Sequence, residues 1–191
     1  MNTGAGKWLR GAAMGLTAGL CLLLPADAVK AAPGGGNWFY EQLNPYTGAW
    51  KGRGFGRRKN SEEKEVVSCK GTHNWLKKGR EFEQRYTCWG GDFAVSGAFR
   101  IRPGKTRGDC IGEAINGAGE VIGKIWGKIK PDGALKVNMK KNFSKTVNQA
   151  SLTPKKNGRI VYSVMAPVKE GGGTREILNI TYKKLKGKKA R

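Results

Sequence analysis

The sequence predicts an all-β protein, a single antiparallel meander of eight to ten strands that closes on itself. Short runs of alternating apolar and polar residues follow one another along most of the chain. Turn signals separate these runs at regular spacing, among them Lys78-Gly79, Pro103-Gly104, Asn116-Gly117 and Asn157-Gly158. Glycine is frequent, at 30 of 191 residues. Many of these glycines lie inside the runs, as is typical of strands that bend in a barrel.

The first 28 residues have the pattern of a secretory signal peptide. Lys7 and Arg10 precede an apolar run over 11–24, Pro25 ends that run, and Ala26-Asp27-Ala28 fits the small-x-small cleavage rule. The run is shorter than the roughly 20 residues that a membrane-spanning helix needs. We therefore expect a signal-peptide helix that is cleaved near Ala28, and a mature protein that is periplasmic or secreted.

The rest of the chain divides into an arm, one domain and a tail. Residues 29–45 are rich in glycine and proline, carry the aromatic run Trp38-Phe39-Tyr40, and are expected to form an irregular arm. Residues 46–185 contain all the alternating runs and form the barrel domain. Residues 186–191 are a basic tail.

The alternation gives each strand an apolar or small face and a basic face. The inward positions are Trp50, Gly52, Gly54, Phe93, Val95, Gly97, Phe99, Ile101, Val121, Gly123, Ile125, Gly127, Ile129, Leu135, Val137 and Met139. A sheet of this many strands usually closes, because closure removes its exposed edges. We predict a lipocalin-like barrel, with a β-sandwich as the alternative. Barrels of about eight strands can enclose one small ligand.

Two cysteines face each other in one predicted hairpin. A two-residue turn at Lys78-Gly79 pairs Lys77 with Arg80. Carried outward, that register places Trp75 opposite Phe82, His73 opposite Gln84, Gly71 opposite Tyr86 and Cys69 opposite Cys88. Directly opposed residues lie about 4.5–5.5 Å apart at Cα, which is within disulfide range. In an exported protein this predicts a Cys69–Cys88 disulfide, with two reduced buried thiols as the alternative. Cys110 is then a buried free thiol or an intermolecular link.

Three segments carry a resemblance to a known group of proteins. They are Gly48-Ala49-Trp50-Lys51-Gly52-Arg53-Gly54, Val66-Val67-Ser68-Cys69 and Phe82-Glu83-Gln84-Arg85-Tyr86-Thr87-Cys88, followed by glycine-rich strands over 112–127. Over roughly residues 46–185 the chain resembles small exported bacterial proteins of unknown function with two hairpin cysteines. The resemblance implies a calycin-like barrel and transfers no catalytic residue. Cys110 and the many lysines depart from the pattern of that group.

The sequence contains little that points to an enzyme. His73 is the only histidine, and the hairpin register places it on the core side, where a structural role is more common than catalysis. One histidine beside a disulfide leaves no zinc ligand set, and nucleophile-elbow, zinc-protease and phosphate-loop motifs do not occur. We expect no catalytic residue, no metal site and no cofactor.

The formal charge of +22 at pH 7 points to anionic partners. In an exported protein these are not cytoplasmic nucleic acids. They are lipopolysaccharide, phospholipid headgroups, acidic polysaccharide or extracellular DNA. The alternative is that the lysines only form a solvated surface. Two candidate sites on the basic face combine an aromatic ring with cations: Arg53, Phe55 and Arg57, and Lys124, Trp126 and Lys128. The simpler explanation, which we prefer here, is that the aromatic arm or a neighbouring chain covers these rings.

A third candidate site is the barrel interior. Its predicted lining is His73, Trp75, Phe82, Tyr86, Phe93 and Phe99, which suits a lipid or another apolar small molecule. The leading hypothesis is a non-enzymatic binding protein that uses this interior together with the basic outer face. The alternative is a structural or inhibitor protein with a filled barrel that acts through protein–protein contacts.

Overall fold

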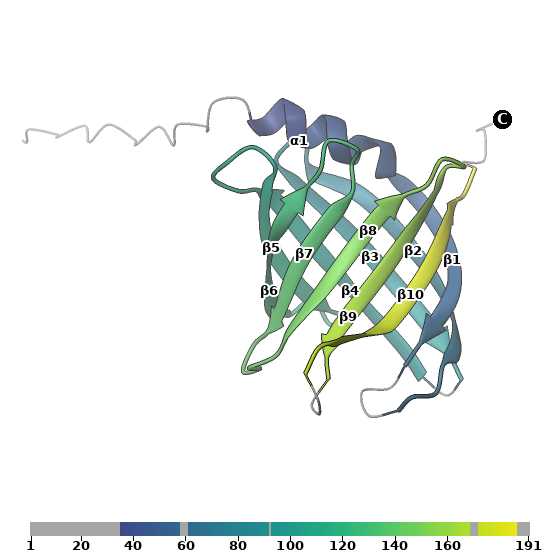
Figure 1. The fold of residues 1–191 in the computed structure, drawn as a ribbon. Coiled ribbons are helices and arrows are strands. Elements are labelled where there is room, and N and C mark those ends of the chain that lie inside the picture. Colours follow the sequence, from purple (N-terminus) through teal and green to yellow (C-terminus); the bar gives the residue numbers. More distant parts are fainter. Residues whose placement is uncertain (1–34, 58–60, 92, 169–171, 187–191) are drawn as a thin grey trace, which may run out of the picture. The chain divides into compact units, whose positions relative to one another are not determined.

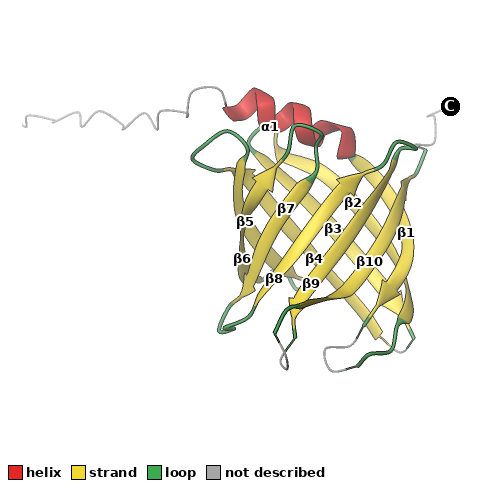
Figure 2. Ribbon diagram, viewed as in Figure 1, coloured by secondary structure: helices red, strands yellow, loops and turns green. Residues whose placement is uncertain are grey.

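The fold is a closed antiparallel β-barrel of ten strands with a short helix at one end (Figures 1 and 2). The computed structural model describes residues 35–57, 61–91, 93–168 and 172–186. The predicted signal peptide and residues 187–191 of the basic tail lie outside these ranges. The closed barrel confirms the all-β meander and excludes the sandwich alternative.

Each strand pairs with the next one along the chain, and the last pairs with the first. The strands are β1 (Gly48–Gly56), β2 (Glu65–Lys77), β3 (Glu81–Gly90), β4 (Phe93–Pro103), β5 (Asp109–Asn116), β6 (Val121–Ile129), β7 (Leu135–Lys141), β8 (Val147–Pro154), β9 (Arg159–Pro167) and β10 (Thr174–Lys184). The β1–β10 pairing, from Trp50 opposite Lys184 to Gly56 opposite Leu178, closes the barrel. Closure leaves no strand edge exposed along the ring.

Residues 35–46 are helical, which corrects the described part of the irregular arm expected over 29–45; residues 29–34 lie outside the described ranges. Helix α1 (Gly35–Leu43) is followed by the 3-10 turn η1 (Asn44–Tyr46). Phe39 and Leu43 are one helical turn apart and both are fully buried. A helix of nine residues is marginal in isolation, so it depends on this tertiary contact and leaves little signal in the sequence. Among the described residues, no helix is both long and apolar enough to span a bilayer.

Two hydrogen bonds tie the end of this helical segment to the barrel. The Tyr46 hydroxyl donates to the carbonyl of Gly133, in the β6–β7 turn, at 2.9 Å. The indole nitrogen of Trp50 donates to the carbonyl of Tyr46 at 2.7 Å. Both bonds are buried, so they hold α1 over the end of the barrel at which β1 begins (Figure 1).

The β2–β3 hairpin has the predicted register over most of its length. Cys69 lies opposite Cys88 with a Cα–Cα distance of 4.1 Å, and the two form the predicted disulfide. In the chain-entropy picture, the closed loop is worth roughly 3 kcal/mol. The register shifts near the turn, where Lys77 faces Glu81 instead of Arg80. A bulge between Trp75 and Lys77 and a longer turn account for that difference.

Glycines inside the strands let neighbouring backbones approach closely. A Cβ on Gly54 would lie 1.8 Å from the Asn179 carbonyl oxygen in β10, and one on Gly112 would lie 1.9 Å from that of Arg100 in β4. No side chain fits at such distances. These positions therefore require glycine because the neighbouring strand backbone occupies the space of a side chain.

Cys110 is buried on β5 and forms no disulfide with a described residue. Within this chain Cys110 is therefore a buried free thiol, which is one of the two alternatives that the sequence left open. Burial, with a smaller contribution from the Asp109 carboxylate, raises the pKa of this thiol to about 12. Cys110 therefore stays protonated and poorly nucleophilic at neutral pH.

Candidate functional site

The interior beneath α1 is packed with aromatic rings. The His73 ring stacks on Trp50 at 5.8 Å between centroids and meets Phe82 edge-on at 6.0 Å. Trp75 lies edge-on to Phe82 at 5.0 Å and to Phe39 of α1 at 5.7 Å. Three of the predicted interior residues are thus brought together, and one of them, Trp75, also contacts the helix.

The other predicted interior residues lie deeper in the barrel. Tyr86 and Phe99 lie 5.4 Å apart between ring centroids, and Phe99 lies 6.1 Å from Tyr162. Burial raises the pKa of both Tyr86 and Tyr162. Phe93 begins β4, but its side chain lies outside the described part of the structure. The inner surface therefore continues as aromatic packing below the helix.

His73 is the most perturbed basic group of the interior. It is 1% exposed. Burial lowers its pKa from 6.5 to about 4, while a hydrogen bond to the backbone of Tyr46 acts in the opposite direction and Lys184 lowers it further. Its Nδ1 atom has no hydrogen-bond partner, and neither has the Trp75 indole nitrogen nearby. His73 is neutral at neutral pH, which suits the structural role expected from its place in the hairpin.

The barrel contains a cavity that is too small for a lipid. Its volume is about 30 Å³, and its lining includes Leu43 and Tyr46 from the helical segment and Phe82, Gln84, Phe99 and Tyr162 from the strands. A water molecule needs about 10–15 Å³ of such volume, whereas ligand pockets have roughly 300–1,000 Å³. Of the predicted interior residues, only Phe82 and Phe99 line it.

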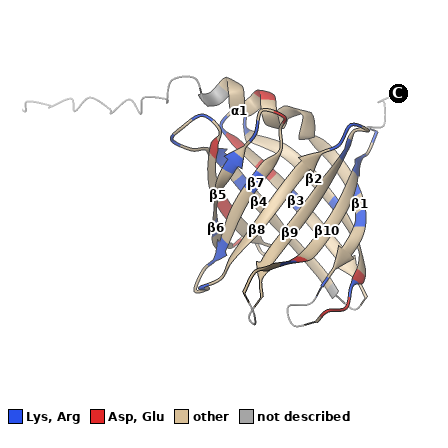
Figure 3. Cartoon of the chain, viewed as in Figure 1, with Lys and Arg blue, Asp and Glu red and all other residues tan. Residues whose placement is uncertain are grey.

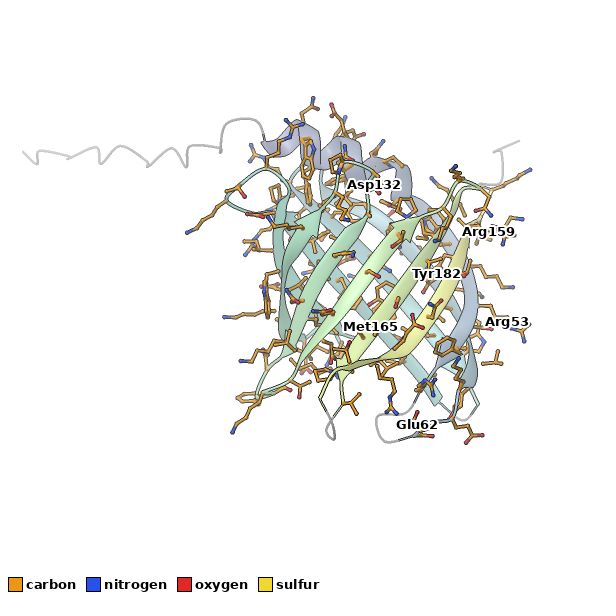
Figure 4. All side chains as sticks on the ribbon, viewed as in Figure 1. Arg53, Glu62, Asp132, Arg159, Met165 and Tyr182 are labelled. Carbon is orange, nitrogen blue, oxygen red and sulfur yellow. A yellow bond between two sulfur atoms is a disulfide. The ribbon has the colours of Figure 1, made fainter. Side chains whose placement is uncertain are left out.

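The first predicted outer site, on β1, already has its ring and one cation engaged. The Phe55 ring lies beneath Lys64 Nζ at 4.5 Å and the Arg57 guanidinium at 5.8 Å. Arg57 also pairs with Glu62 at 3.7 Å, so both the ring and this guanidinium have partners within the protein. Arg53 is exposed and points outward from β1 (Figure 4). This cluster offers a ligand little beyond Arg53.

The second predicted outer site, on β6, is accessible. Trp126 is 39% exposed and lies between Lys124 and Lys128, which are both exposed. Lys128 pairs with Asp109 on β5 at 3.1 Å. Phe39 and Tyr40 of the aromatic run pack on Trp75, so they do not cover Trp126. β1 and β6 are five strands apart in the closed ring, so the two predicted outer sites lie on opposite sides of the barrel.

Trp126 forms part of an open groove that also reaches α1. The groove has a volume of about 1,160 Å³, and we call it the Trp38–Trp126 groove. Its charged lining consists of Lys105, Arg107, Lys128, Lys130, Lys136, Asp109 and Glu41. Lys124 is not part of this lining. The groove therefore combines the exposed Trp126 indole and the largely buried Trp38 indole with five cations and two carboxylates.

Most of the groove cations are free to meet a ligand. Arg107 lies over the Trp38 ring at 5.9 Å, and Lys128 holds Asp109. The Thr106 hydroxyl and the Lys128 ammonium group lower the pKa of Asp109. Lys105, Lys130 and Lys136 form no ion pair with any described residue. Figure 3 shows basic residues around the strand ends near α1, and acidic residues toward the β1–β2 connection.

The sequence pattern identified part of this groove and missed the rest. Alternation along β6 placed Trp126 and Lys128 correctly on the outer face. Trp38, Lys105 and Arg107 were missed, because they come from α1 and from the β4–β5 connection. No local pattern signals that a helix 88 positions away contributes a second indole ring to the same groove.

The described residues hold no group of three or more His, Cys, Asp or Glu side chains arranged to bind a metal ion.

The comparison with protein-family models finds no match, and neither does the comparison with curated proteins. Among solved structures, the chain is similar to the S-type phycobiliprotein lyase CPES from Guillardia theta, with a TM-score of 0.55 and 8% identity. The match covers 78% of this chain and 93% of that one. At this identity the likeness concerns the fold alone, and it agrees with the calycin-like barrel that the sequence implies.

Proposed function

We propose that this protein is an exported, non-enzymatic binding protein whose ligand site is the Trp38–Trp126 groove. The ligand we propose is an anionic carbohydrate chain. The observation that carries the proposal is that two indole rings share one open groove with Lys105, Lys130 and Lys136, whose charges are unpaired by described residues. Ring faces provide apolar area for sugar rings, and cations pair with their carboxylate or sulfate groups.

The global charge supports the same class of ligand. A formal charge of +22 attracts polyanions over long range and speeds their encounter with the protein. The groove is also large enough for several sugar rings, whereas the interior cavity has room for only about two water molecules. The groove therefore fits an anionic chain better than the interior fits any ligand of comparable size.

Trp126→Ala is expected to weaken binding of polygalacturonate roughly tenfold, because a stacking ring contributes about 1–2 kcal/mol. Isothermal titration calorimetry on the purified barrel measures this effect. The double variant Lys130→Gln/Lys136→Gln should also weaken binding and should flatten its dependence on salt.

The matched control for charge is Lys51→Gln/Arg53→Gln. This variant also removes two positive charges, but from β1, on the opposite side of the barrel. We expect this variant to retain most of the affinity. Equal weakening by the control and by the groove variant would show that only net charge matters, and it would overturn the groove as the ligand site.

An apolar ligand in the barrel interior is the second candidate function. What favours it is the apolar cavity beneath α1, where Gln84 provides a polar side chain among mainly apolar ones. An occupant of lipid size requires that Leu43 and Tyr46 move with the helical segment, because both line that cavity.

Native mass spectrometry of the protein isolated from its own source tests export and the interior ligand together. We expect the mass of a chain that lacks residues 1–28, without a bound lipid. An intact N-terminus would contradict export with cleavage near Ala28. A retained mass of lipid size would instead favour the interior as the ligand site.

A further inference from the structure

The β7–β8 turn displays a phenylalanine in an unfavourable backbone conformation. Phe143 has a φ of 60° and is the one non-glycine residue with positive φ in the described part of the chain. Bulky side chains rarely adopt this conformation, because Cβ then crowds the backbone. The side chain gains no burial in return, since Phe143 is 108% exposed. Strain at an exposed position of this kind marks a candidate functional site.

The turn is ordered by hydrogen bonds. The Ser144 amide donates to the Lys141 carbonyl at 3.2 Å and closes the turn. Asn142 attaches the turn to the start of β6. Its backbone amide donates to the Ile122 carbonyl at 2.8 Å, and its side-chain amide donates to the Val121 carbonyl at 3.0 Å. These bonds hold the turn so that the Phe143 ring projects into solvent.

Several exposed lysines flank this turn along the chain and on the neighbouring strand. Lys140 and Lys141 end β7, Lys145 follows the turn, and Lys124 of β6 lies opposite Lys140. Residues 140–147 contain no acidic side chain. A single exposed aromatic ring among several cations matches the chemistry of a bilayer interface, where rings enter the headgroup region and ammonium groups pair with phosphates.

The same end of the barrel carries other exposed apolar side chains. Helix α1 covers the opposite end, and the β7–β8 turn lies at the end away from it (Figure 1). The exposed apolar residues near the strand ends on this side are Val66, Trp89, Val95, Val121 and Val168. The acidic residues at this end include Glu62, Glu63 and Glu65 near the β1–β2 connection, and Glu120 in the β5–β6 turn, which accepts a hydrogen bond from the Asn116 side chain at 2.8 Å. Because the lysines gather around the β7–β8 turn, we expect an anionic surface to contact this end of the barrel at that turn.

We infer that the β7–β8 turn docks the protein on an anionic phospholipid bilayer, with Phe143 inserted among the headgroups and the flanking lysines paired with lipid phosphates. The inference stands apart from the proposed carbohydrate site, because the turn shares no residue with the Trp38–Trp126 groove. With the turn on the membrane, the end of the barrel that carries α1 faces the surrounding solution.

Phe143→Asn is the sharpest test. Asparagine tolerates positive φ, so we expect the melting temperature to stay the same or to rise. Binding to vesicles with roughly one-third phosphatidylglycerol in phosphatidylcholine should nevertheless fall roughly tenfold or more, as measured by co-sedimentation. Phe143→Trp should retain binding, because tryptophan suits the bilayer interface.

Leu76→Asn provides the matched control. Leu76 is an exposed apolar residue beside the basic β2–β3 turn, at the end of the barrel that α1 covers. We expect this variant to bind the vesicles like the wild type. Unchanged binding of Phe143→Asn, equal loss in Leu76→Asn, or equal binding of the wild type to pure phosphatidylcholine would each overturn the inference.

Discussion

Phe39→Ala is expected to lower the free energy of unfolding by about 3–5 kcal/mol. Phe39 is fully buried although it belongs to a short helix outside the sheet, and its ring lies edge-on to Trp75. Truncation leaves a cavity that the surrounding strands cannot fill, because the barrel is closed. Urea unfolding followed by tryptophan fluorescence measures the loss.

Glu41→Ala is the control for this effect, since Glu41 lies on the exposed side of the same helix. Its truncation removes a hydrogen bond to Asn37 at 2.9 Å and should cost about 0.5 kcal/mol or less. If both variants lost equally little stability, α1 would not be part of the core, and the barrel end would be open in solution.

Acidification from pH 6.5 to about 4 is expected to remove about 3 kcal/mol of stability through His73. Its pKa is about 4 in the folded protein and about 6.5 when it is solvated, so over this interval the unfolded chain binds the extra proton. Stability from this group is complete above pH 6.5 and falls as the pH drops toward 4. Urea midpoints measured across this range report the slope.

His73→Phe isolates the contribution of the histidine. The variant keeps an aromatic ring beside Trp50 but cannot take up a proton. Its stability between pH 6.5 and 4 should fall less steeply than that of the wild type. The carboxylates titrate in both proteins, so only the difference between the two slopes belongs to His73. Parallel slopes would contradict a buried, neutral His73.

The barrel was predictable because strand alternation and turn signals are local. The inward positions Gly123, Ile125 and Ile129 of β6 and the Cys69–Cys88 pair follow from counting residues in steps of two along an antiparallel register. The inward positions predicted for Val95 and Val121 were wrong: these side chains are 47% and 46% exposed at strand ends, and Val121 adjoins a register shift between β5 and β6. The last pair before the β2–β3 turn was wrong, because a bulge at a hairpin end depends on side-chain packing. Helix α1 was missed for a related reason: its stability comes from the barrel, which the local pattern of residues 35–43 does not contain.

The candidate sites show the same difference between features set by the local sequence and features set by tertiary structure. Trp126 was found because it alternates with lysines on one strand. Its partner Trp38 and the cations of the β4–β5 connection share the groove only through tertiary structure. The strained conformation of Phe143 also leaves no mark in the sequence, since Asn142-Phe143-Ser144 looks like an ordinary polar turn with one apolar residue.

The β1–β10 pairing gives folding a definite last step. β1 is synthesised before every other strand and β10 after all of them, so the first strand has a free edge until the last one arrives. Contacts between such distant segments form slowly, because the loop between them is long. A chain interrupted before Thr174 exposes the edges of β1 and β9 together, and both are templates for pairing with other chains. The β1–β10 pairing, which removes every exposed edge from the finished barrel, is therefore also the place at which an unfinished chain is most prone to aggregate.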